Sequence, residues 1–477
     1  MVFSSFVFLL VFLPIVLLLY YICPGRLRNL ILLVFSLIFY AWGEPVYVLI
    51  MLFSIVFDYA NGRLIEHFKN KNCPGKAKAA LIVDLCGNLA ILGFFKYTDF
   101  VIGSINSITG AGLSLLHIAL PIGISFYTFQ TMSYTIDVYR GEVAAQKNIL
   151  TFATYVTLFP QLIAGPIVKY RDINEAIENR VMNADEIAKG LRRFICGLGK
   201  KVLIANTAGL VADHVFTAAH SKVNFVVAWI GAIAYLMQIY YDFSGYSDMA
   251  IGLGHMFGFR FKENFQYPYG ADSIQEFWRR WHISLSTWFK EYLYIPLGGN
   301  RKGTARTCIN RIIVFFFTGL WHGANWTFVI WGLWHGMFLL FETYCPIVKK
   351  APKVIARIYT LLVVCVGFVM FRADTLTEGL FMIKQMFTGF SMDPASMSFA
   401  VQQLTPWFVV MLAAGIIGAA PIRKLVDHIR ENVQPEVLAG KWKTVQIVLY
   451  VASAVLLIWC MIRLSGSTYN PFIYFRF

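Results

Sequence analysis

Apolar segments recur along the sequence, and each is long enough, or nearly long enough, to cross a lipid bilayer. They occupy residues 2–22, 29–42, 46–60, 79–97, 119–137, 222–243, 312–344, 354–371, 405–420 and 444–463. A helical span needs about 20 mostly apolar residues, and helices satisfy every backbone polar group inside the bilayer. The pattern therefore predicts an all-α polytopic membrane protein with about ten or eleven transmembrane helices.

Composition agrees with a membrane protein. Hydrophobic residues make up 58% of the chain and charged residues 14%, whereas soluble domains carry about 25% charged residues. No long polar segment separates two halves, so we expect a single membrane domain over residues 1–477. It would have N-terminal spans in 1–97, a core at 119–345 and C-terminal spans in 354–465. The N-terminus lacks a basic region and a cleavage site, which favours a retained first helix over a signal peptide.

The net charge of +15 fits cytoplasmic loops and contact with anionic membrane lipid, so we predict no role in nucleic-acid binding. Lys and Arg gather in residues 23–28, 61–78 and 138–148, which predicts that these segments are cytoplasmic. Residues 98–118 contain neither and are expected outside. A share of the basic residues could hold a phosphorylated donor at the cytoplasmic face. The eight Cys are scattered and form no CxxC, so we predict no disulfide framework and no metal site.

One apolar segment, residues 148–168, does not fit a simple span. Basic segments flank it on both sides, and it contains Pro160 and Gly165–Pro166. Non-helical backbone survives at membrane depth only where protein or a water-filled cavity covers it. The segment therefore predicts a re-entrant piece beside an internal cavity, and a true span with a weak topology signal is the alternative.

Two other polar stretches lie in apolar surroundings. Residues 240–254 crowd Asp242, Ser244, Ser247 and Asp248 into a Gly-containing region, which predicts a second broken stretch at membrane depth. Residues 186–201 are amphipathic, with basic side chains on one side, and predict an interfacial helix. Its basic residues are Arg192, Arg193, Lys200 and Lys201.

The main polar insertion, residues 259–310, contains a predicted helix. Ser273 is expected to cap its start with Glu276 as the partner of a capping box, and the helix should run to about Tyr294. Aromatic residues alternate with basic ones along it, which suits the membrane interface. These residues are Trp278, Arg279, Arg280, Trp281, Trp288, Lys290 and Tyr292.

His322 is the first candidate for a functional residue because it follows a purely apolar run. A charged or polar group at that depth costs about 2.5–3.5 kcal/mol or more. The helical period places Asn325 and Trp326 within about 60° of His322, and His335 about 140° away. A buried imidazole stays neutral and can act as a general base near pH 7. The alternative is a structural His bonded to a carbonyl, and a Ser–His–Asp arrangement also stays open.

Several motifs together resemble the membrane-bound O-acyltransferase family. They are FWRRWHISLSTWFKEYLYIPLGGNR (277–301) and TGLWHGANWTFVIWGLWHG (318–336). DFSGYSDMAIG (242–252), FPQLIAGPIVKY (159–170) and NPFIYFRF (470–477) are similar to the bacterial branch that O-acetylates alginate and other exopolysaccharides.

The resemblance implies a helical bundle with re-entrant segments and a central funnel or tunnel. It implies acyl transfer from a thioester donor, acetyl-CoA, to a hydroxyl, with no bound cofactor. His322 takes the place of the invariant family histidine and His282 that of the second one. His322 would accept the proton of the attacking hydroxyl, while His282 or Asn325 would position a reactant or the thioester carbonyl. The expected substrate- or tunnel-lining residues are Asn325, Trp326, Asp242, Ser244, Trp281, Arg279 and Arg280.

The same resemblance implies partners and a location. The acceptor would be an extracytoplasmic polysaccharide, reached directly or through a partner acetyltransferase, and the protein would lie in the bacterial cytoplasmic (inner) membrane. Two alternatives remain: D-alanyl transfer to teichoic acid from a carrier protein, and a non-enzymatic transporter or flippase.

Overall fold

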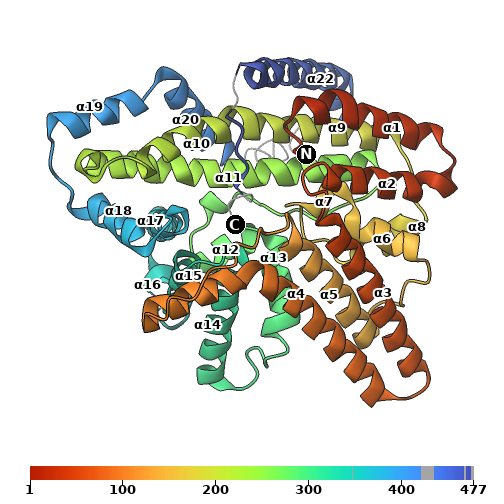
Figure 1. Ribbon diagram of the computed structural model, residues 1–477. Helices are drawn as coiled ribbons and strands as arrows, with labels where there is room; N and C mark the ends of the chain where they lie inside the picture. The colour runs from red at the N-terminus through yellow and green to blue at the C-terminus, as the bar shows by residue number, and fades with distance from the viewer. Residues whose placement is uncertain (346, 421–434, 467–468, 474–477) are drawn as a thin grey trace. The chain divides into compact units, whose positions relative to one another are not determined.

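The computed structural model describes residues 1–345, 347–420, 435–466 and 469–473, and these are helices and loops without a β-strand (Figure 1). Two compact units are present: Met1–Leu191 with Met249–Lys262, and Arg192–Asp248 with Glu263–Phe477. The all-α prediction is confirmed, and the single-domain prediction stays a prediction. Residues 421–434 of the expected C-terminal region lie outside the described residues.

The first unit contains the N-terminal helices. They are η1 (Val7–Phe12), α1 (Leu13–Ile22), α2 (Arg28–Ala41), α3 (Val48–Asn70), α4 (Pro74–Thr109), α5 (Ile124–Arg140), α6 (Ile149–Thr157), α7 (Phe159–Leu162) and α8 (Tyr170–Glu178). Helices α3, α4 and α5 pack against one another. The predicted loop 61–78 is shorter than expected, because α3 and α4 continue into it and leave only residues 71–73 between them. Ile65, within this stretch, is buried and so anchors the end of α3.

The segment 148–168 is broken, as the prolines and the flanking basic residues predict. Helix α6 ends at Thr157, and Leu158 has a non-helical backbone before the short α7. All residues from 151 to 170 are buried, and the Phe159 N–H donates to Ser36 Oγ over 3.1 Å. The freed backbone groups are thus covered by protein, and the segment is not one continuous span.

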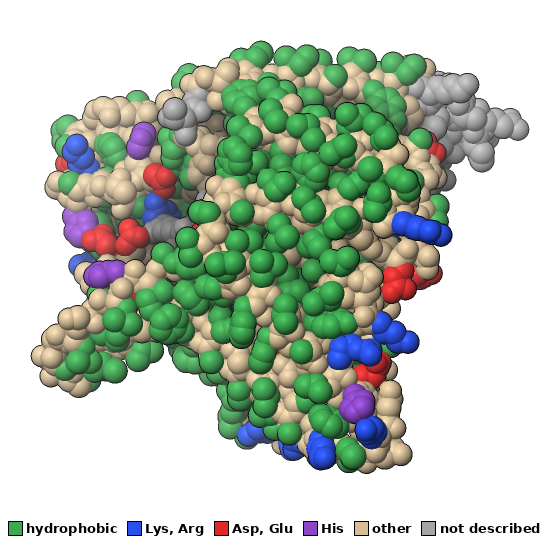
Figure 2. Space-filling model, turned by 45° about the vertical axis from the view of Figure 1, so that its right-hand side comes forward, with side chains coloured by type: hydrophobic (Ala, Val, Ile, Leu, Met, Phe, Trp, Pro, Cys, Tyr) green, Lys and Arg blue, Asp and Glu red, His purple; other side chains and the backbone are tan. Residues whose placement is uncertain are grey.

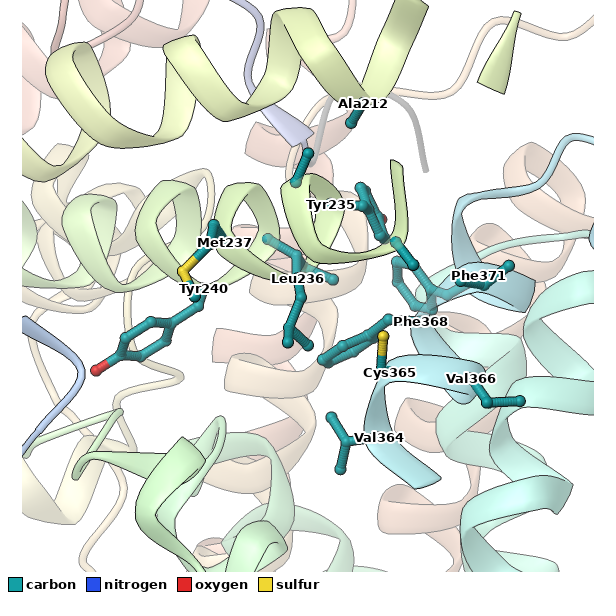
Figure 3. Packing of buried hydrophobic residues seen from close by; sticks show 14 of the residues in the cluster. Ala212, Tyr235, Leu236, Met237, Tyr240, Val364, Cys365, Val366, Phe368 and Phe371 are labelled. Atoms are coloured by element: carbon teal, nitrogen blue, oxygen red, sulfur yellow. The ribbon is translucent and has the colours of Figure 1, made fainter. Parts of the chain in front are cut away.

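The second unit contains the predicted core motifs. Its helices include α10 (Asn206–Phe216), α12 (Ile274–Arg280), α13 (Ile283–Phe289), α14 (Gly303–His322), α15 (Trp326–Tyr344), α16 (Ile347–Lys350), α17 (Lys353–Arg372), α18 (Leu376–Thr388), α19 (Pro394–Gln403), α20 (Pro406–Gly418) and α22 (Pro435–Ser465). Two further helices, α9 (Ala184–Gly199) and α11 (Phe225–Met256), contain residues of both units. Figure 3 shows α11 and α17 side by side in one hydrophobic cluster, with Leu236 and Phe368 among its members.

The predicted break at residues 240–254 is wrong, because α11 runs through it without interruption. Gly245 serves close packing instead. A Cβ at this position would lie 2.8 Å from the carbonyl oxygen of Gly197 in α9, so the two helices can approach only without a side chain here. The glycine marks a helix–helix contact and not the end of a helix.

The interfacial position of the helix 186–201 stays a prediction, but several of its basic side chains have partners inside the protein. Arg193 and Lys200 form ion pairs with Asp248 of α11 at 2.8 and 2.6 Å, and Lys201 pairs with Asp242 at 2.6 Å. The stretch Ala184–Phe216 is itself a candidate span. The basic side faces partners inside the protein because α11 supplies the matching carboxylates.

Among the described residues, six helices are long and apolar enough to cross a bilayer, or seven if α19 and α20, bent by 65°, form one broken span. They are α3, α4, Ala184–Phe216, α11, α17 and Thr444–Ser465. This is fewer than the predicted ten or eleven, since other apolar segments form short or broken helices such as Val7–Ile22. Figure 2 shows many hydrophobic side chains on the surface drawn, as expected of a multi-pass membrane protein.

Candidate functional site

Two histidines predicted from the sequence lie together in the second unit. His322 ends α14 and His282 precedes α13, and their ring centres are 6.3 Å apart. Both are buried, with 5% and 0% of the residue exposed. The Trp321 ring is 5.8 Å from His282 and 5.0 Å from His322. The structure therefore brings the pair into one aromatic environment.

A break at His282 places this residue in the site. The Ser273 cap is confirmed, because its Oγ accepts from the Glu276 N–H over 3.1 Å. The predicted continuous helix to Tyr294 is wrong: α12 ends at Arg280, and His282 has φ 43° and ψ 55°. A left-handed backbone at a residue other than glycine costs about 1–3 kcal/mol and clusters at functional sites.

Asn264, which the sequence analysis missed, orients His282. Its Oδ1 lies 3.2 Å from His282 Nδ1 and accepts from the Ser284 N–H (3.1 Å) and Oγ (2.9 Å). Its Nδ2 donates to Ser247 Oγ over 3.2 Å. Because the amide oxygen only accepts, Nδ1 carries the proton and Nε2 carries the lone pair. No motif marks Asn264 in the sequence, since it lies in a loop 18 residues before its partner.

Burial keeps His282 uncharged. It lowers the pKa of the His282 imidazole to about 3, so the ring is neutral at pH 7. Within the described part of the chain, Nε2 is buried and has no hydrogen-bond partner. A neutral ring with a fixed tautomer can accept a hydrogen bond at Nε2 from a hydroxyl that enters the site.

The predicted helical face shared by His322, Asn325 and Trp326 is wrong, because α14 ends at His322 and α15 begins at Trp326. Asn325 caps α15: its Oδ1 accepts from the Thr327 N–H over 3.1 Å. Its Nδ2 donates to the Asp374 carbonyl over 2.9 Å. Trp326 is 46% exposed. Neither side chain is placed with the histidine pair as predicted.

A small apolar cavity adjoins His322. Its volume is about 10 Å³, the room of a single water. The residues that line it are Ile239, Phe243, Trp281, His322, Trp331, Phe368, Phe371 and Ile473. Trp281, one of the predicted lining residues, is among them, and its role stays a prediction. A group of one or two heavy atoms fits beside the imidazole without rearrangement, and a long chain does not.

The other predicted lining residues are not part of the lining of this cavity. Arg280 and Arg279 pair with Glu276 at 2.8 and 3.6 Å, and Arg279 lines a separate cavity of about 240 Å³. Ser244 is buried but does not line either cavity. Asp242 Oδ2 accepts from the N–H of Ile473 over 2.8 Å and so supports one wall of the His322 cavity indirectly.

His335 is completely buried and lines neither of these two cavities. Its ring packs 5.1 Å from Trp278 and 5.3 Å from Trp331. The ring centre of Trp331 also lies 5.0 Å from that of His322, so the Trp331 ring packs against both His322 and His335. Among the described residues, no group of three or more His, Cys, Asp or Glu could hold a metal ion.

Comparison with known proteins identifies the family. The family model for the membrane-bound O-acyltransferases matches residues 141–371, which include both histidines of the pair. The probable alginate O-acetylase AlgI of Pseudomonas putida is 43% identical over the whole of both chains. The peptidoglycan O-acetyltransferase of Helicobacter pylori is 39% identical over 81% of this chain and 80% of its own. The teichoic acid D-alanyltransferase of Bacillus subtilis is 27% identical over 52% of this chain and 68% of its own. The chain belongs to the membrane-bound O-acyltransferase family and is an acyltransferase.

Proposed function

We propose that this protein moves an acetyl group from acetyl-CoA in the cytoplasm to a hydroxyl of an extracytoplasmic polysaccharide. It would act in the bacterial inner membrane, directly or by relay to a partner acetyltransferase. The names of the relatives support O-acetylation of a polysaccharide. The observation that carries the proposal is the buried pair of His282 and His322, 6.3 Å apart, with a small apolar cavity beside His322.

The proposed chemistry uses His322 as a general base. The acceptor oxygen attacks the thioester carbonyl carbon, and the imidazole of His322 takes the hydroxyl proton. The C–S bond then breaks, and the departing thiolate takes up that proton to give free CoA. General-base catalysis contributes about 10²–10⁴ in rate, so positioning of the reactants must contribute the remainder.

His282 would orient the acceptor. Its Nδ1 proton is committed to Asn264, so only the Nε2 lone pair is left to bind a ligand. A lone pair accepts a hydrogen bond from a hydroxyl, whereas it cannot stabilise the oxyanion of the thioester carbon. This assigns His282 to the acceptor side of the reaction and leaves the carbonyl oxygen to other groups.

The cavity supports a short acyl group. The space of about 10 Å³ beside His322 is small and lined mainly by apolar side chains, which disfavours the longer and charged D-alanyl group. The D-alanyl transferase is also the more distant relative, at 27% identity over about half of this chain. Both facts favour acetyl transfer over D-alanyl transfer.

The test uses purified protein in liposomes with labelled acetyl-CoA and a soluble oligosaccharide acceptor. We expect free CoA and labelled oligosaccharide, and we expect His322→Ala to lower the rate of CoA release at least about 100-fold. His220→Ala is the matched control: its side chain is 52% exposed, and the substitution should leave the rate unchanged.

Turnover by His322→Ala at the normal rate contradicts the assignment of His322 as the general base. Passage of intact label across the membrane identifies a transporter instead, and capture of an acyl carrier protein favours D-alanyl transfer.

A further inference from the structure

The first unit contains a polar cavity that the proposed reaction does not use. Its volume is about 490 Å³. Three arginines, Arg26, Arg28 and Arg180, line it together with one carboxylate, Glu178, and several amide or hydroxyl side chains. No large apolar side chain is part of the lining, so the cavity suits a polar, charged ligand.

Two of the arginines are held close together in spite of their like charge. The guanidinium carbon of Arg28 lies 5.3 Å from the centre of the Tyr20 ring, and that of Arg180 lies 5.7 Å from the same centre. Arg180 also lies 4.7 Å from the Phe259 ring centre and donates to Asn29 Oδ1. Burial lowers the pKa of Arg180, and the charge of Arg28 lowers it further. Like charges repel, so a bound anion would relieve this arrangement.

Each of these two guanidinium groups keeps a donor without an acceptor. Nε of Arg28 and Nη1 of Arg180 are buried and have no hydrogen-bond partner among the residues that the structure describes. A buried donor left unsatisfied costs about 1–3 kcal/mol, and more when it is charged. The carboxylate of Glu178 accepts from Gln146 Nε2 over 3.0 Å, and the cavity remains net positive.

The three segments that line the cavity belong to stretches with the sequence character of cytoplasmic loops. The first segment, Gly25–Asn29, overlaps the basic stretch 23–28. Gln146 and Asn148 lie at the end of the basic stretch 138–148. Glu178, Asn179 and Arg180 lie in the charged stretch that follows residue 168. The positive-inside rule places such stretches in the cytoplasm. The ligand would therefore come from the cytosol or from the inner leaflet.

We propose that this cavity binds a phosphate group at the cytoplasmic face. Phosphate oxygens match guanidinium donors in paired, charge-assisted hydrogen bonds, and several oxygens can engage both arginines at once. Two sources share this chemistry: a soluble phosphate such as those of CoA, and the headgroup of an anionic phospholipid. The inference goes beyond the proposed function and does not require turnover.

Binding is measured on the full-length protein carrying His322→Ala, with ligands that carry no acetyl group, so that no acetyl transfer takes place. One arm titrates inorganic phosphate and CoA in detergent by calorimetry. The other arm compares retention of phosphatidylglycerol and phosphatidylcholine by native mass spectrometry. We expect Arg28→Gln with Arg180→Gln to weaken binding about 10- to 100-fold, the change for loss of a hydrogen bond to a charged group. Arg260→Gln, whose side chain is 79% exposed, is the control and should bind normally.

A second pair of variants guards against misfolding. Arg28→Lys with Arg180→Lys keeps both charges but loses the paired donors, and we expect weaker binding in a folded protein. Loss in the CoA arm identifies a soluble phosphate, and loss in the lipid arm identifies a headgroup. The inference is overturned if phosphate, CoA and phosphatidylglycerol all fail to bind the parent protein, or bind the Gln and Lys variants equally well. Because no acetyl donor is present in either arm, these results are independent of the test of His322.

Discussion

At the scale of single residues, Asn264 holds the strained backbone of His282 in place. Its carbonyl accepts from the Ile283 N–H over 3.0 Å, and its side-chain oxygen accepts from Ser284. One residue therefore fixes the backbone on the C-terminal side of His282 and also its tautomer. The resemblance in the sequence indicates both histidines, but it does not indicate what orients them, because that depends on a loop brought close by folding.

Asn264→Asp should move the pH dependence of acetyl transfer. A carboxylate beside Nδ1 favours the imidazolium, so the pKa of His282 rises from about 3. Activity that needs neutral His282 is fully present above the new pKa and is lost as the pH falls through it. We expect the acid limb of the rate profile to move to higher pH, with a larger loss at pH 6 than at pH 8, measured as CoA release.

Asn264→Ala is the control for this shift. It leaves the donors of His282 and Ser284 without their acceptor, so the rate should fall about 10-fold or more at every pH, through loss of orientation. Its acid limb should stay where the parent has it. An equal loss at pH 6 and pH 8 in Asn264→Asp would show that Asn264 has only a structural role.

At the scale of helices, the breaks decide where the functional side chains lie. The break at Leu158 could be predicted from Pro160 and the flanking basic segments. The break after His322 was not predicted, because the sequence analysis placed His322, Asn325 and Trp326 on one continuous helix. Gly323 allows the turn: a Cβ there would lie 2.2 Å from the Phe328 ring, a contact made only after folding. Glycines at 245 and 332 have the opposite role and permit close packing of intact helices.

Gly332→Ala should lower the stability of the α14–α15 pair. A Cβ at Gly332 would lie 2.2 Å from the carbonyl oxygen of Phe315, and the backbone of α14 cannot yield as a side chain would. Overpacking of this kind costs about 1–3 kcal/mol. We expect a lower thermal unfolding midpoint in detergent, followed by tryptophan fluorescence, and a lower transfer rate, since α14 carries His322.

Gly93→Ala provides the matched comparison. This glycine lies in α4, and a Cβ there would meet no atom within 4 Å. Alanine also favours a helix over glycine by about 1 kcal/mol. The midpoint should stay the same or rise. Equal midpoints for the two variants would show that the contact between α14 and α15 tolerates a methyl group.

At the scale of the whole molecule, charge is distributed differently from what the sequence suggests. The excess of Lys and Arg predicts basic cytoplasmic loops, yet Arg193, Lys200 and Lys201 form ion pairs with acids of α11. Lys201 and Asp242 are 4% and 2% exposed. Lys201 also donates to the Pro471 carbonyl, while Asp242 accepts from Ile473. A local sequence pattern cannot predict ion pairs between segments that are far apart in the chain. The apolar runs that predict a polytopic membrane protein are local, and the sequence therefore shows them.

This ion pair couples the end of the described chain to the His322 cavity, and two variants separate its roles. Asp242→Ala leaves the charge of Lys201 buried without its partner, at a cost of about 3–5 kcal/mol, and removes the acceptor of Ile473. Lys201→Met with Asp242→Leu removes both charges and should regain most of the unfolding midpoint. It still lacks the acceptor for Ile473, which lines the cavity, so its transfer rate should remain below that of the parent. A double variant as unstable as Asp242→Ala would refute the charge argument, and one with the full parental rate would show that the contact with Ile473 does not shape the site.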